Sequence, residues 1–256
     1  MWSESRLQRI QTLLQRFERI TTGHVAQELD VSRETVRRDF LELEAQGVLK
    51  RVHGGALLVQ EEPPIDKRNT IRVSHKQALA RAAAQRIDHP VSLFMDAGST
   101  TTLLARELAL MSNLTIITNS LDAAALFRDS QATARQNNQI ILIGGQLSEH
   151  VAATTGPSAV EEIHRFQVDI ALLSPVGVDA RHGATSFHHG EAVIARAMSS
   201  CARQTWILAD YSKIGVRSRE SYCMPDRIGL LVSNTQARQR EGYEALAAAV
   251  PEVLLA

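Results

Sequence analysis

The stretch VSRETVRRDFLELEAQGVLKRVHGG, from Val31 to Gly55, decides how the beginning of the chain folds. Ser32 stands immediately before a run with helical spacing, so we expect its hydroxyl to cap a helix by accepting a free backbone N–H. Val36, Phe40 and Leu43 recur at helical spacing and predict one buried stripe. The stretch therefore predicts a helix that packs one face on a core and leaves the other face open.

The open face of this helix and the residues after it are rich in cations. The helix is expected to end at Gly47, because glycine adopts a left-handed turn without strain. A strand over 48–52 and a return strand over 56–59 would enclose the turn His53-Gly54-Gly55. The side chains expected to point outward are Arg33, Thr35, Arg37, Arg38, Lys50 and Arg51. Cations on a helix followed by a basic hairpin are typical of a helix in the DNA major groove with a wing on the backbone.

The alternative interpretation is an exposed helix of mixed charge that contacts nothing. Glu34 and Arg38 are four residues apart in the favourable order for an ion pair, and Asp39, Glu42 and Glu44 add negative charge. Residues 1–58 carry 9 Lys and Arg against 8 Asp and Glu, and the whole chain of 256 residues has a formal net charge of +0. DNA binding would therefore depend on where the cations lie rather than on bulk charge.

The residues before this stretch predict two further helices. Ser3 or Ser5 caps the first, whose apolar stripe is Leu7, Ile10, Leu14 and Phe17. After an extended link over 19–21, Thr22 is expected to cap a second short helix that ends at Asp30. Three short helices, the last two joined by a tight turn, indicate a helix-turn-helix, and the hairpin makes it winged.

Residues 6–58 resemble the N-terminal domain of the DeoR family of bacterial transcriptional regulators. The residues that match are Ser32, Thr35, Val36, Arg37, Arg38, Asp39 and the run from Leu43 to Gly55. The resemblance implies that Ser32, Arg33, Thr35, Arg37 and Arg38 face DNA, and that Lys50, Arg51 and His53 contact phosphates through the wing. It also implies a structural role for Asp39, which would hold an arginine or an N–H in place.

A change of composition over Gln60 to Arg72 marks a linker. The prolines of Glu61-Glu62-Pro63-Pro64 disfavour helix at the residues before them, and the residues that follow are polar and charged. We therefore divide the chain into a winged helix-turn-helix at 1–58, a linker at 59–74 and a second domain at 75–256.

The second domain alternates helices with buried strands. Helices are expected over 75–87, 99–110, 121–129, 157–166, 191–203 and 237–250. Strands are expected over 91–95, 114–118, 139–143, 169–173, 206–209, 228–232 and 253–256. This alternation, with strands rich in Ile, Val and Leu, indicates an α/β fold with a parallel sheet covered on both faces. Ligands of such sheets bind beyond the carboxyl ends of the strands.

Five polar clusters fall where strands end. They are Asp96 to Thr101, Thr118-Asn119-Ser120, Gly144-Gly145, Gly183 to Glu191, and Asp210 to Lys213. Hydroxyls and N–H groups at a helix start form an anion site, although each cluster alone is equally explained by a helix cap, a tight turn or a surface lysine. Together at one edge of a sheet they predict a pocket for a small anion that carries hydroxyls.

Residues 75–235 resemble the DeoR-family effector domain, which is similar in fold to ribose-5-phosphate isomerase, glucosamine-6-phosphate deaminase and coenzyme A transferases. The resemblance implies a phosphorylated sugar or related metabolite as effector, with its phosphate on Ser99 to Thr101 and Lys213 and its hydroxyls on Asp96, Asn119 and Glu191. The full set of expected effector-binding residues is Asp96, Gly98, Ser99, Thr100, Thr101, Asn119, Ser120, Gly144, Gly145, Glu191 and Lys213. Ser174-Pro175 and Phe187-His188-His189 depart from the family pattern, which points to an atypical sugar or sugar-acid derivative.

The sequence thus predicts a DNA-binding transcriptional regulator, typically a repressor of a carbohydrate-utilisation operon, that forms dimers or tetramers on duplex operator DNA. The alternatives are a sugar-phosphate isomerase or deaminase with an added DNA-binding domain, and a binder of structured RNA. A second catalytic acid or base beside Glu191 is not evident, and we expect no cofactor, no metal and no catalytic site. Without a visible signal peptide or membrane span, and with two cysteines outside any ligand spacing, a cytoplasmic protein is expected.

Overall fold

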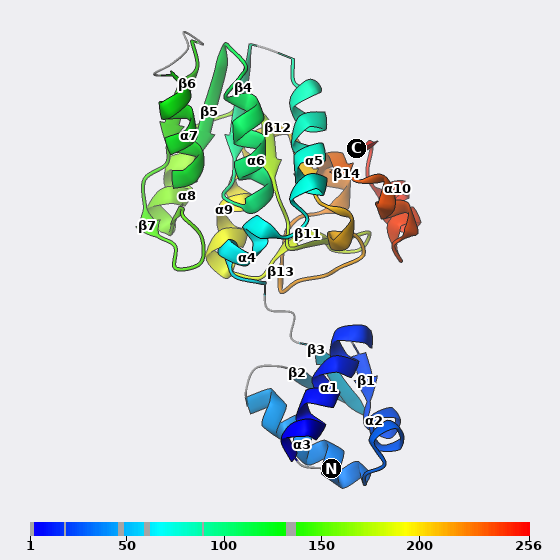
Figure 1. Cartoon of the computed structure of the whole chain (residues 1–256). Coiled ribbons are helices and arrows are strands. Elements are labelled where there is room, and N and C mark those ends of the chain that lie inside the picture. The colour runs from blue at the N-terminus through cyan, green and yellow to red at the C-terminus, as the bar shows by residue number, and fades with distance from the viewer. Residues whose placement is uncertain (1–2, 18, 46–48, 59–61, 89, 132–136) are drawn as a thin grey trace. The chain divides into compact units, whose positions relative to one another are not determined.

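The computed structural model describes residues 3–17, 19–45, 49–58, 62–88, 90–131 and 137–256. The chain forms two compact units, Met1–Glu61 and Glu62–Ala256, which are described separately below (Figure 1). Every helix among the described residues is too short or too polar to cross a bilayer.

The first unit is a winged helix-turn-helix. Its elements are α1 (Ser3–Phe17), β1 (Arg19–Thr21), α2 (Thr22–Leu29), α3 (Arg33–Ala45), β2 (Leu49–Val52) and β3 (Gly55–Leu58). The three strands form an antiparallel sheet in the order β1-β3-β2, and the apolar stripes of the helices pack into one core that includes Val36, Phe40 and Leu43. Gly55 is required in β3, because a Cβ there would lie 2.1 Å from the carbonyl oxygen of Ile20.

The helix starts follow side-chain capping, with one difference from expectation. Ser32 Oγ accepts the backbone N–H of Thr35 at 3.1 Å, which confirms the predicted cap of α3. For α2 the cap is Thr21 rather than Thr22, because Thr21 has the extended backbone of a cap and accepts the N–H of His24. The predicted helix end at Gly47, and strand residues 48 and 59, lie outside the described residues.

The structure differs from the expected linker over 62–72. Residues Ile65–Thr70 form a short helix, α4, and Val73–Gln85 form α5. The prolines precede α4 rather than interrupt it, so that the carbonyl of Pro64 accepts the N–H of Arg68 at the first turn. This segment packs within the second unit, where an ion pair joins Arg68 to Glu62.

The second unit is built on a parallel sheet. Among the described residues seven strands pair in the order β15-β14-β12-β9-β4-β5-β6, and each of these pairs is parallel. The strands are β4 (Val91–Met95), β5 (Leu114–Thr118), β6 (Gln139–Leu142), β9 (Val168–Leu173), β12 (Ala202–Leu208), β14 (Ile228–Ser233) and β15 (Val253–Leu255). The predicted parallel α/β fold is therefore confirmed, and the bounds predicted for β4 and β5 are those observed.

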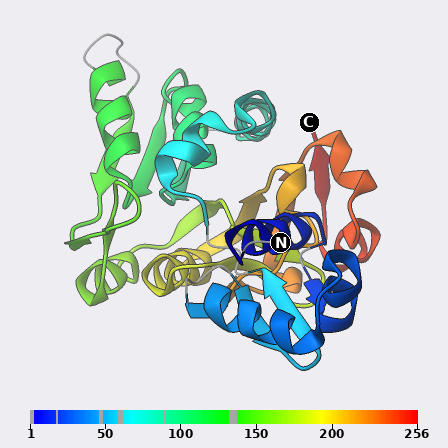
Figure 2. The ribbon, with the colours of Figure 1, turned by 60° about the horizontal axis from the view of Figure 1, so that its bottom comes forward.

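Helices cover both faces of this sheet (Figures 1 and 2). Helices α5, α6 (Ser99–Leu108) and α7 (Leu121–Gln131) pack on one face through residues such as Leu79, Leu104 and Phe127. Helices α8 (Pro157–Ile163), α9 (His189–Ser200) and α10 (Tyr243–Ala249) contribute to the core on the other face. The expected helix over 237–250 is divided into a short 3-10 helix, Thr235–Gln239, and α10, because Gly242 between them has φ of 85°.

Short antiparallel strands that the sequence analysis did not predict complete the unit. Strands β10 (Gly177–Asp179), β11 (Gly183–Ser186) and β13 (Glu220–Cys223) form a small sheet beside α9, and β7 (Gln146–Leu147) pairs with β8 (Thr154–Thr155). Their positions matter for function, since Ser186, Tyr222 and Thr155 line a cavity at the carboxyl ends of the parallel strands.

Candidate functional site

Helix α3 and the β2–β3 hairpin of the first unit border one hollow. Arg33 and Arg37 reach it from α3, while Arg51 and His53 reach it from the hairpin. Gly23 at the start of α2 and Gly54 in the turn lie at its edge. The structure thus brings together four of the eight side chains expected to face DNA. The other four lie outside the hollow, with Ser32, Arg38 and Lys50 exposed and Thr35 half-buried.

The ion pair of Arg37 on α3 is exposed and weak, so it does not prevent that cation from contacting DNA. Arg37 pairs with Glu34 at 3.3 Å, so the expected pairing of Glu34 with Arg38 is replaced by one a residue earlier. Both side chains of the observed pair are about two-thirds exposed or more, at 65% and 72%. An exposed pair of this kind contributes little to stability and exchanges readily for a phosphate.

Two carboxylates that accept short hydrogen bonds from arginines join parts of the first unit. The carboxylate of Asp39, 2% exposed, accepts two hydrogen bonds from Arg6 of α1 at 2.6 and 2.8 Å and raises the pKa of that arginine. Glu44 accepts both the backbone N–H and the side chain of Arg51, and these hydrogen bonds lower the pKa of Glu44. The structural role expected for Asp39 is confirmed, and Glu44 fastens the hairpin to the end of α3.

The second unit contains two adjoining cavities at the carboxyl ends of the parallel strands. The first is named the acidic cavity, and its polar lining is Glu62, Arg68, Asp96, Asn119, Thr155, Ser174, Ser186, Glu191 and Tyr222. The second is named the basic cavity, and its polar lining is Glu62, Arg68, Arg72, Lys76, Ser99, Thr100, Ser174, Asp210 and Lys213. The two cavities adjoin, because Glu62, Arg68 and Ser174 line both.

Strand ends position the polar residues of both cavities. Asp96 follows β4, Asn119 follows β5, and Ser174 follows β9. Asp96 Oδ2 accepts the N–H of Ser174 at 3.0 Å, which ties the two neighbouring strand ends together. Parallel strands end at one edge of a sheet, so residues 20 to 80 positions apart in the sequence meet there.

Unpartnered polar atoms gather in the acidic cavity. Six buried side-chain atoms without a hydrogen-bond partner belong to residues that line it: Glu62 Oε2, Arg68 Nε, Asp96 Oδ1, Asn119 Oδ1, Glu191 Oε1 and Tyr222 OH. Among the described residues only His75 Nδ1 adds to this set. Buried polar groups in folded proteins are normally satisfied, so this concentration makes the acidic cavity a candidate ligand site.

Burial shifts the ionisation of the carboxyl groups in the acidic cavity. It raises the pKa of Asp96 to about 7, although the N–H of Ser174 opposes the rise. Burial also raises the pKa of Glu191 to about 7, and the negative charges of Glu62 and Asp96 raise it further. The pKa of Glu62 is raised by burial against the opposing charge of Arg68. Asp96 and Glu191 therefore exchange protons near neutral pH.

Lys76 connects the basic cavity to α4 and α6. Its ammonium group donates to the hydroxyl of Ser99 at 2.9 Å and to the backbone carbonyl of Arg68. Burial lowers the pKa of Lys76 to about 8, although the carboxylate of Asp210 opposes this. The lysine thus lies at the N-terminus of α6, where backbone N–H groups already favour an anion.

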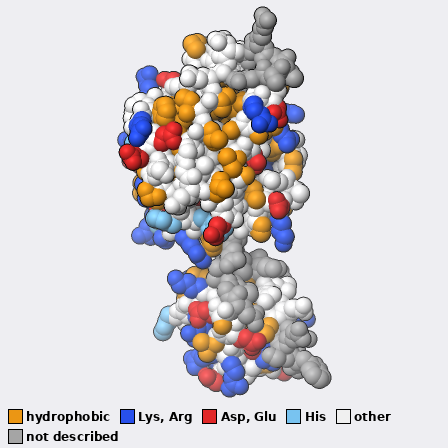
Figure 3. All heavy atoms as spheres, turned by 90° about the vertical axis from the view of Figure 1, so that its left-hand side faces the viewer, with side chains coloured by type: hydrophobic (Ala, Val, Ile, Leu, Met, Phe, Trp, Pro, Cys, Tyr) orange, Lys and Arg blue, Asp and Glu red, His pale blue; other side chains and the backbone are white. Residues whose placement is uncertain are grey.

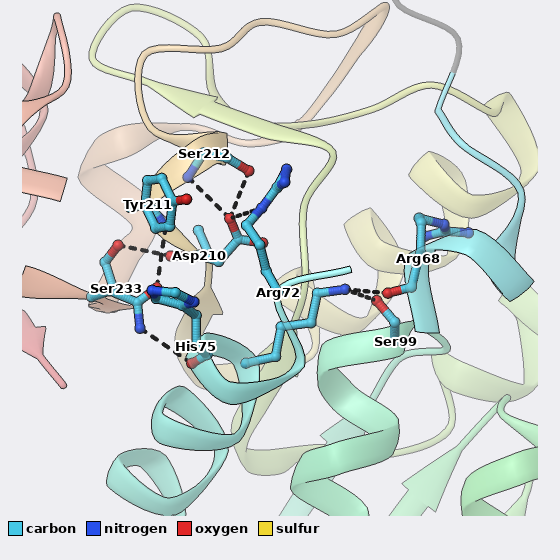
Figure 4. Close-up of polar contacts among 11 residues, drawn as sticks. Arg68, Arg72, His75, Ser99, Asp210, Tyr211, Ser212 and Ser233 are labelled. Carbon is cyan, nitrogen blue, oxygen red and sulfur yellow. Dashed lines mark hydrogen bonds and ion pairs between the residues drawn. The ribbon is translucent and has the colours of Figure 1, made fainter. Parts of the chain in front are cut away.

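The other cations that line the basic cavity lie near carboxylates. Arg72 donates to Asp210 at 3.2 Å, and Asp210 also accepts two hydrogen bonds from Ser212 (Figure 4). Burial raises the pKa of Asp210, but the hydrogen bonds from Ser212 and the charge of Arg72 outweigh it, so the net shift is downward. Burial lowers the pKa of Lys213, opposed by the nearby carboxylates of Glu62 and Asp210.

The predicted effector-binding residues divide into three groups. Asp96, Asn119 and Glu191 line the acidic cavity, and Ser99, Thr100 and Lys213 line the basic cavity. Five others line neither cavity: Gly98, Thr101, Ser120, Gly144 and Gly145.

The structure gives some of these five residues other tasks. Ser120 Oγ accepts the N–H of Ala123 at the start of α7. Gly144 donates its N–H to Glu162, and a Cβ on Gly145 would lie 2.6 Å from the carbonyl of Thr155. Close backbone packing therefore accounts for the glycine at position 145.

Sequence reasoning missed several lining residues. They are Glu62, Arg68, Arg72, Lys76 and Tyr222. One signal was present, because Arg68, Arg72 and Lys76 recur four residues apart and so share one side if the chain is helical there. The assignment of 59–74 to a linker hid it.

Comparison with known families accounts for both units. A model described as "DeoR-like helix-turn-helix domain" matches residues 6–62, and one described as "DeoR C terminal sensor domain" matches residues 71–235. The chain belongs to the DeoR family of transcriptional regulators. Within this family the helix-turn-helix domain binds DNA and the C-terminal domain senses an effector, so the predictions of family, fold class and regulatory function are confirmed.

Curated members of the DeoR family match nearly the whole chain. The HTH-type transcriptional repressor GlcR of Bacillus subtilis is 32% identical over 96% of this chain and 96% of its own length. The glycerol-3-phosphate regulon repressor of Escherichia coli is 30% identical over 77% of each chain. These relatives are named as transcriptional repressors, and this chain is likewise a DeoR-family transcriptional regulator.

Solved structures match the chain more weakly. Ribose 5-phosphate isomerase A from Neisseria gonorrhoeae is 13% identical with a TM-score of 0.42, and the match covers 59% of this chain and 56% of that chain.

Proposed function

We propose that this DeoR-family regulator represses a carbohydrate-utilisation operon and that a phosphorylated sugar or related metabolite controls its hold on the operator. The observation that carries the effector part is the gathering of six unpartnered buried polar atoms beside a cavity lined by four cations. Repression is proposed because relatives such as GlcR and the glycerol-3-phosphate regulon repressor are named repressors.

In this proposal α3 enters the major groove. Ser32, Arg33, Thr35, Arg37 and Arg38 would face the groove, and their exposure or their position at the start of α3 supports this. The wing would contact phosphates through the exposed side chains of Lys50, Arg51 and His53. The hollow bordered by α3 and the hairpin supports a joint role for Arg33, Arg37, Arg51 and His53.

The effector phosphate would lie in the basic cavity at the N-terminus of α6. Ser99 and Thr100 would offer hydroxyl and N–H groups there, and Lys76 and Lys213 would supply positive charge. The rest of the effector would extend into the acidic cavity, where Asp96, Asn119 and Glu191 would hydrogen-bond it. Glu62 and Arg68, shared by both cavities, would contact the middle of the ligand.

The position of these residues in the sequence supports coupling between the effector and DNA. Glu62 and Arg68 follow the helix-turn-helix domain directly in the chain, and Lys76 binds both the carbonyl of Arg68 and the hydroxyl of Ser99. A phosphate that engages Lys76 and Arg68 would therefore bear on α4, the first helix after the DNA-binding domain. The change in DNA affinity is limited by the difference in the ligand's affinity for the conformation that binds DNA and the conformation that does not.

We assign DNA binding to residues 1–58, and effector binding and self-association to 75–256, with part of the intervening 59–74 contributing to the cavities. A dimer or tetramer in the cytoplasm would read repeated half-sites. The edge strand β6 supports self-association, since Leu142 and Leu147 near it are 42% and 72% exposed. Figure 3 shows hydrophobic side chains scattered over this side of the second unit.

A mobility-shift experiment tests the proposal. Duplexes from the regions upstream of neighbouring genes are titrated with the full chain at fixed salt, then repeated with a panel of phosphorylated metabolites. We expect at least one duplex to bind specifically and one metabolite to change that affinity by roughly tenfold, a coupling of about 1.4 kcal/mol. Specific binding that no phosphorylated metabolite alters would contradict the effector part, and competition by structured RNA as strong as by duplex DNA would contradict the operator part.

A further inference from the structure

The unpartnered atoms of the acidic cavity are mostly hydrogen-bond acceptors. Glu62 Oε2, Asp96 Oδ1 and Glu191 Oε1 belong to carboxyl groups, and Asn119 Oδ1 is an amide oxygen. The orientation of that amide is fixed, because its Nδ2 donates to the carbonyl of Thr154 at 2.8 Å. Asp96 and Asn119 are more than nine-tenths buried, at 9% and 4% exposure. The hydroxyls of Thr101 and Ser186 partly oppose the burial that raises the pKa of Asp96 and of Glu191, and the four oxygens can still accept donors from a ligand.

The charges of this cavity are equally one-sided. Three carboxyl groups line it, and among the described lining residues Arg68 is the one cationic side chain. Arg68 is already engaged, since its guanidinium forms an ion pair with Glu62 Oε1. Asp96 and Glu191 therefore face the cavity without a cation of their own.

Ligand groups differ in how well they suit such a lining. A hydroxyl brings one donor together with acceptor lone pairs, so several hydroxyls leave acceptors facing acceptors. A carboxylate, as in a sugar acid, brings only acceptors and a like charge, which is costly in a buried site. An ammonium group brings three donors, no acceptor and the opposite charge. The ammonium group fits the atoms and the charge together.

We propose that the end of the effector in the acidic cavity carries an ammonium group, so that the effector is a phosphorylated amino sugar or amino polyol rather than a phosphorylated sugar acid. The inference rests on the proposed function, because it takes the phosphate to lie in the basic cavity. Asp96 and Glu191 are the specificity-determining residues, and the apolar side chains of Ala97, Val151 and Ile194 cover the carbon skeleton.

The ionisation of the cavity gives the proposal a second signature. Asp96 and Glu191 each have a pKa of about 7. The titratable and charged groups that line the cavity with them are Glu62, Arg68 and the phenol of Tyr222. Lys213, His150 and Lys76 are further titratable groups whose charges act on Glu62. A bound ammonium favours the ionised carboxylates and lowers both pKa values, so binding releases protons near pH 7. A neutral polyol bound by protonated carboxyl groups would instead bind more tightly as the pH falls.

Calorimetry on the full chain with matched probes tests the inference. Three skeletons are each offered as neutral, amino and acid members: glucose 6-phosphate, glucosamine 6-phosphate and 6-phosphogluconate; the corresponding galacto series; and glycerol 3-phosphate, serinol phosphate and 3-phosphoglycerate. We expect the amino member of at least one skeleton to bind about tenfold to a hundredfold more tightly than its neutral partner, as a charge-assisted hydrogen bond predicts. Titration at pH 7 in two buffers of different ionisation enthalpy should show proton release.

A matched pair of variants assigns the preference to the cavity. Glu191→Gln keeps the shape of the side chain and removes its charge, and we expect it to reduce the preference for the amino member to about threefold or less. Glu161→Gln, at an exposed position of α8, is the control and should keep the full preference. The proton-release measurement uses the unaltered chain, so it tests the inference even if Glu191→Gln folds poorly.

The outcomes separate the inference from the proposed function. The inference is overturned, and a phosphorylated effector stays in place, if the amino member binds no more tightly than its neutral or acid partner in every skeleton that binds. It is also overturned if the preferred amino member binds without proton release. If no member of any skeleton binds, the phosphorylated carbohydrate effector itself is wrong, and the inference falls with it.

Discussion

Lys76 and Ser99 lie 23 residues apart in the sequence, and the ammonium group of one donates to the hydroxyl of the other at 2.9 Å. The same ammonium group donates to the backbone carbonyl of Arg68. One side chain therefore joins α4, α5 and α6 at the place where we propose that a phosphate binds.

Lys76→Met should weaken effector binding by tenfold or more, because a buried cation that hydrogen-bonds a phosphate contributes about 1.5–3 kcal/mol. With a pKa of about 8, Lys76 loses its proton as the pH rises, so effector affinity in the unaltered protein should fall above pH 8. Calorimetry at pH 7 and pH 9 measures both effects. Lys67→Met, exposed on α4, is the control, and equal losses in the two variants would remove Lys76 from the site.

Arg37→Ala and Arg38→Ala should each cost about 1–3 kcal/mol in operator binding if these side chains contact base edges. The exposed pair of Arg37 with Glu34 opposes this only weakly, since such pairs contribute about 0–1 kcal/mol. Mobility shifts on operator and on scrambled duplex at one salt concentration give the specificity ratio. A variant that loses equal affinity for both duplexes contacts phosphate alone, and Arg240→Ala in the second unit serves as the unaffected control.

Asp39→Ala should destabilise the helix-turn-helix unit by about 3–5 kcal/mol, because it leaves Arg6 largely buried without its carboxylate partner. A unit of this size has little stability to spare, so the part of the helical signal that comes from α1 to α3 and the binding to operator should both be lost at 37 °C. Urea denaturation followed by circular dichroism measures the change. Glu42→Ala, exposed on the same helix, is the control and should keep the urea midpoint of the unaltered chain. An unchanged urea midpoint for Asp39→Ala would contradict a stabilising role for its ion pair.

Asp96→Asn should make stability less sensitive to pH. The folded-state pKa of Asp96, about 7, lies above its ordinary value of 3.8, so the folded form binds more protons. Stability from this group is complete below about pH 4 and is lost as the pH rises through 7. Without effector, the variant should therefore gain several degrees in Tm over the unaltered chain at pH 8 and little at pH 4.5. Scanning calorimetry at both values decides, and an equal shift at the two pH values would contradict the assignment.

The sequence predicted well wherever local signals agreed. Strands β4 and β5 are runs of buried residues bounded by turn signals, and their predicted bounds are those observed. The cap at Ser32 needed only a hydroxyl three residues before a free N–H. Asp96 and Asn119 could be placed together because parallel strands share a carboxyl edge. Each of these inferences uses neighbouring residues or a rule that holds for every sheet of this kind.

The rest depended on contacts between distant parts of the chain. Pro63 and Pro64 suggested an extended linker, yet they precede the helix α4. Arg68 in that helix lines both cavities. Tyr222 reaches the acidic cavity from β13, a strand of four residues whose partner β11 lies more than thirty residues earlier. Pairing of that kind is set by tertiary packing rather than by local propensity.

The contribution of Glu62 and Arg68 to the cavities has a practical consequence for protein engineering. A hybrid regulator that takes its DNA-binding head from another family member should be joined before Glu62, so that α4 stays with the sensor it helps to build. A junction placed after Thr70 would replace Glu62 and Arg68, which line the cavities, with residues of the other protein. It would alter which metabolite the hybrid detects, even though every strand of the sensor is kept. Choosing where to splice thus becomes a way of tuning biosensor selectivity.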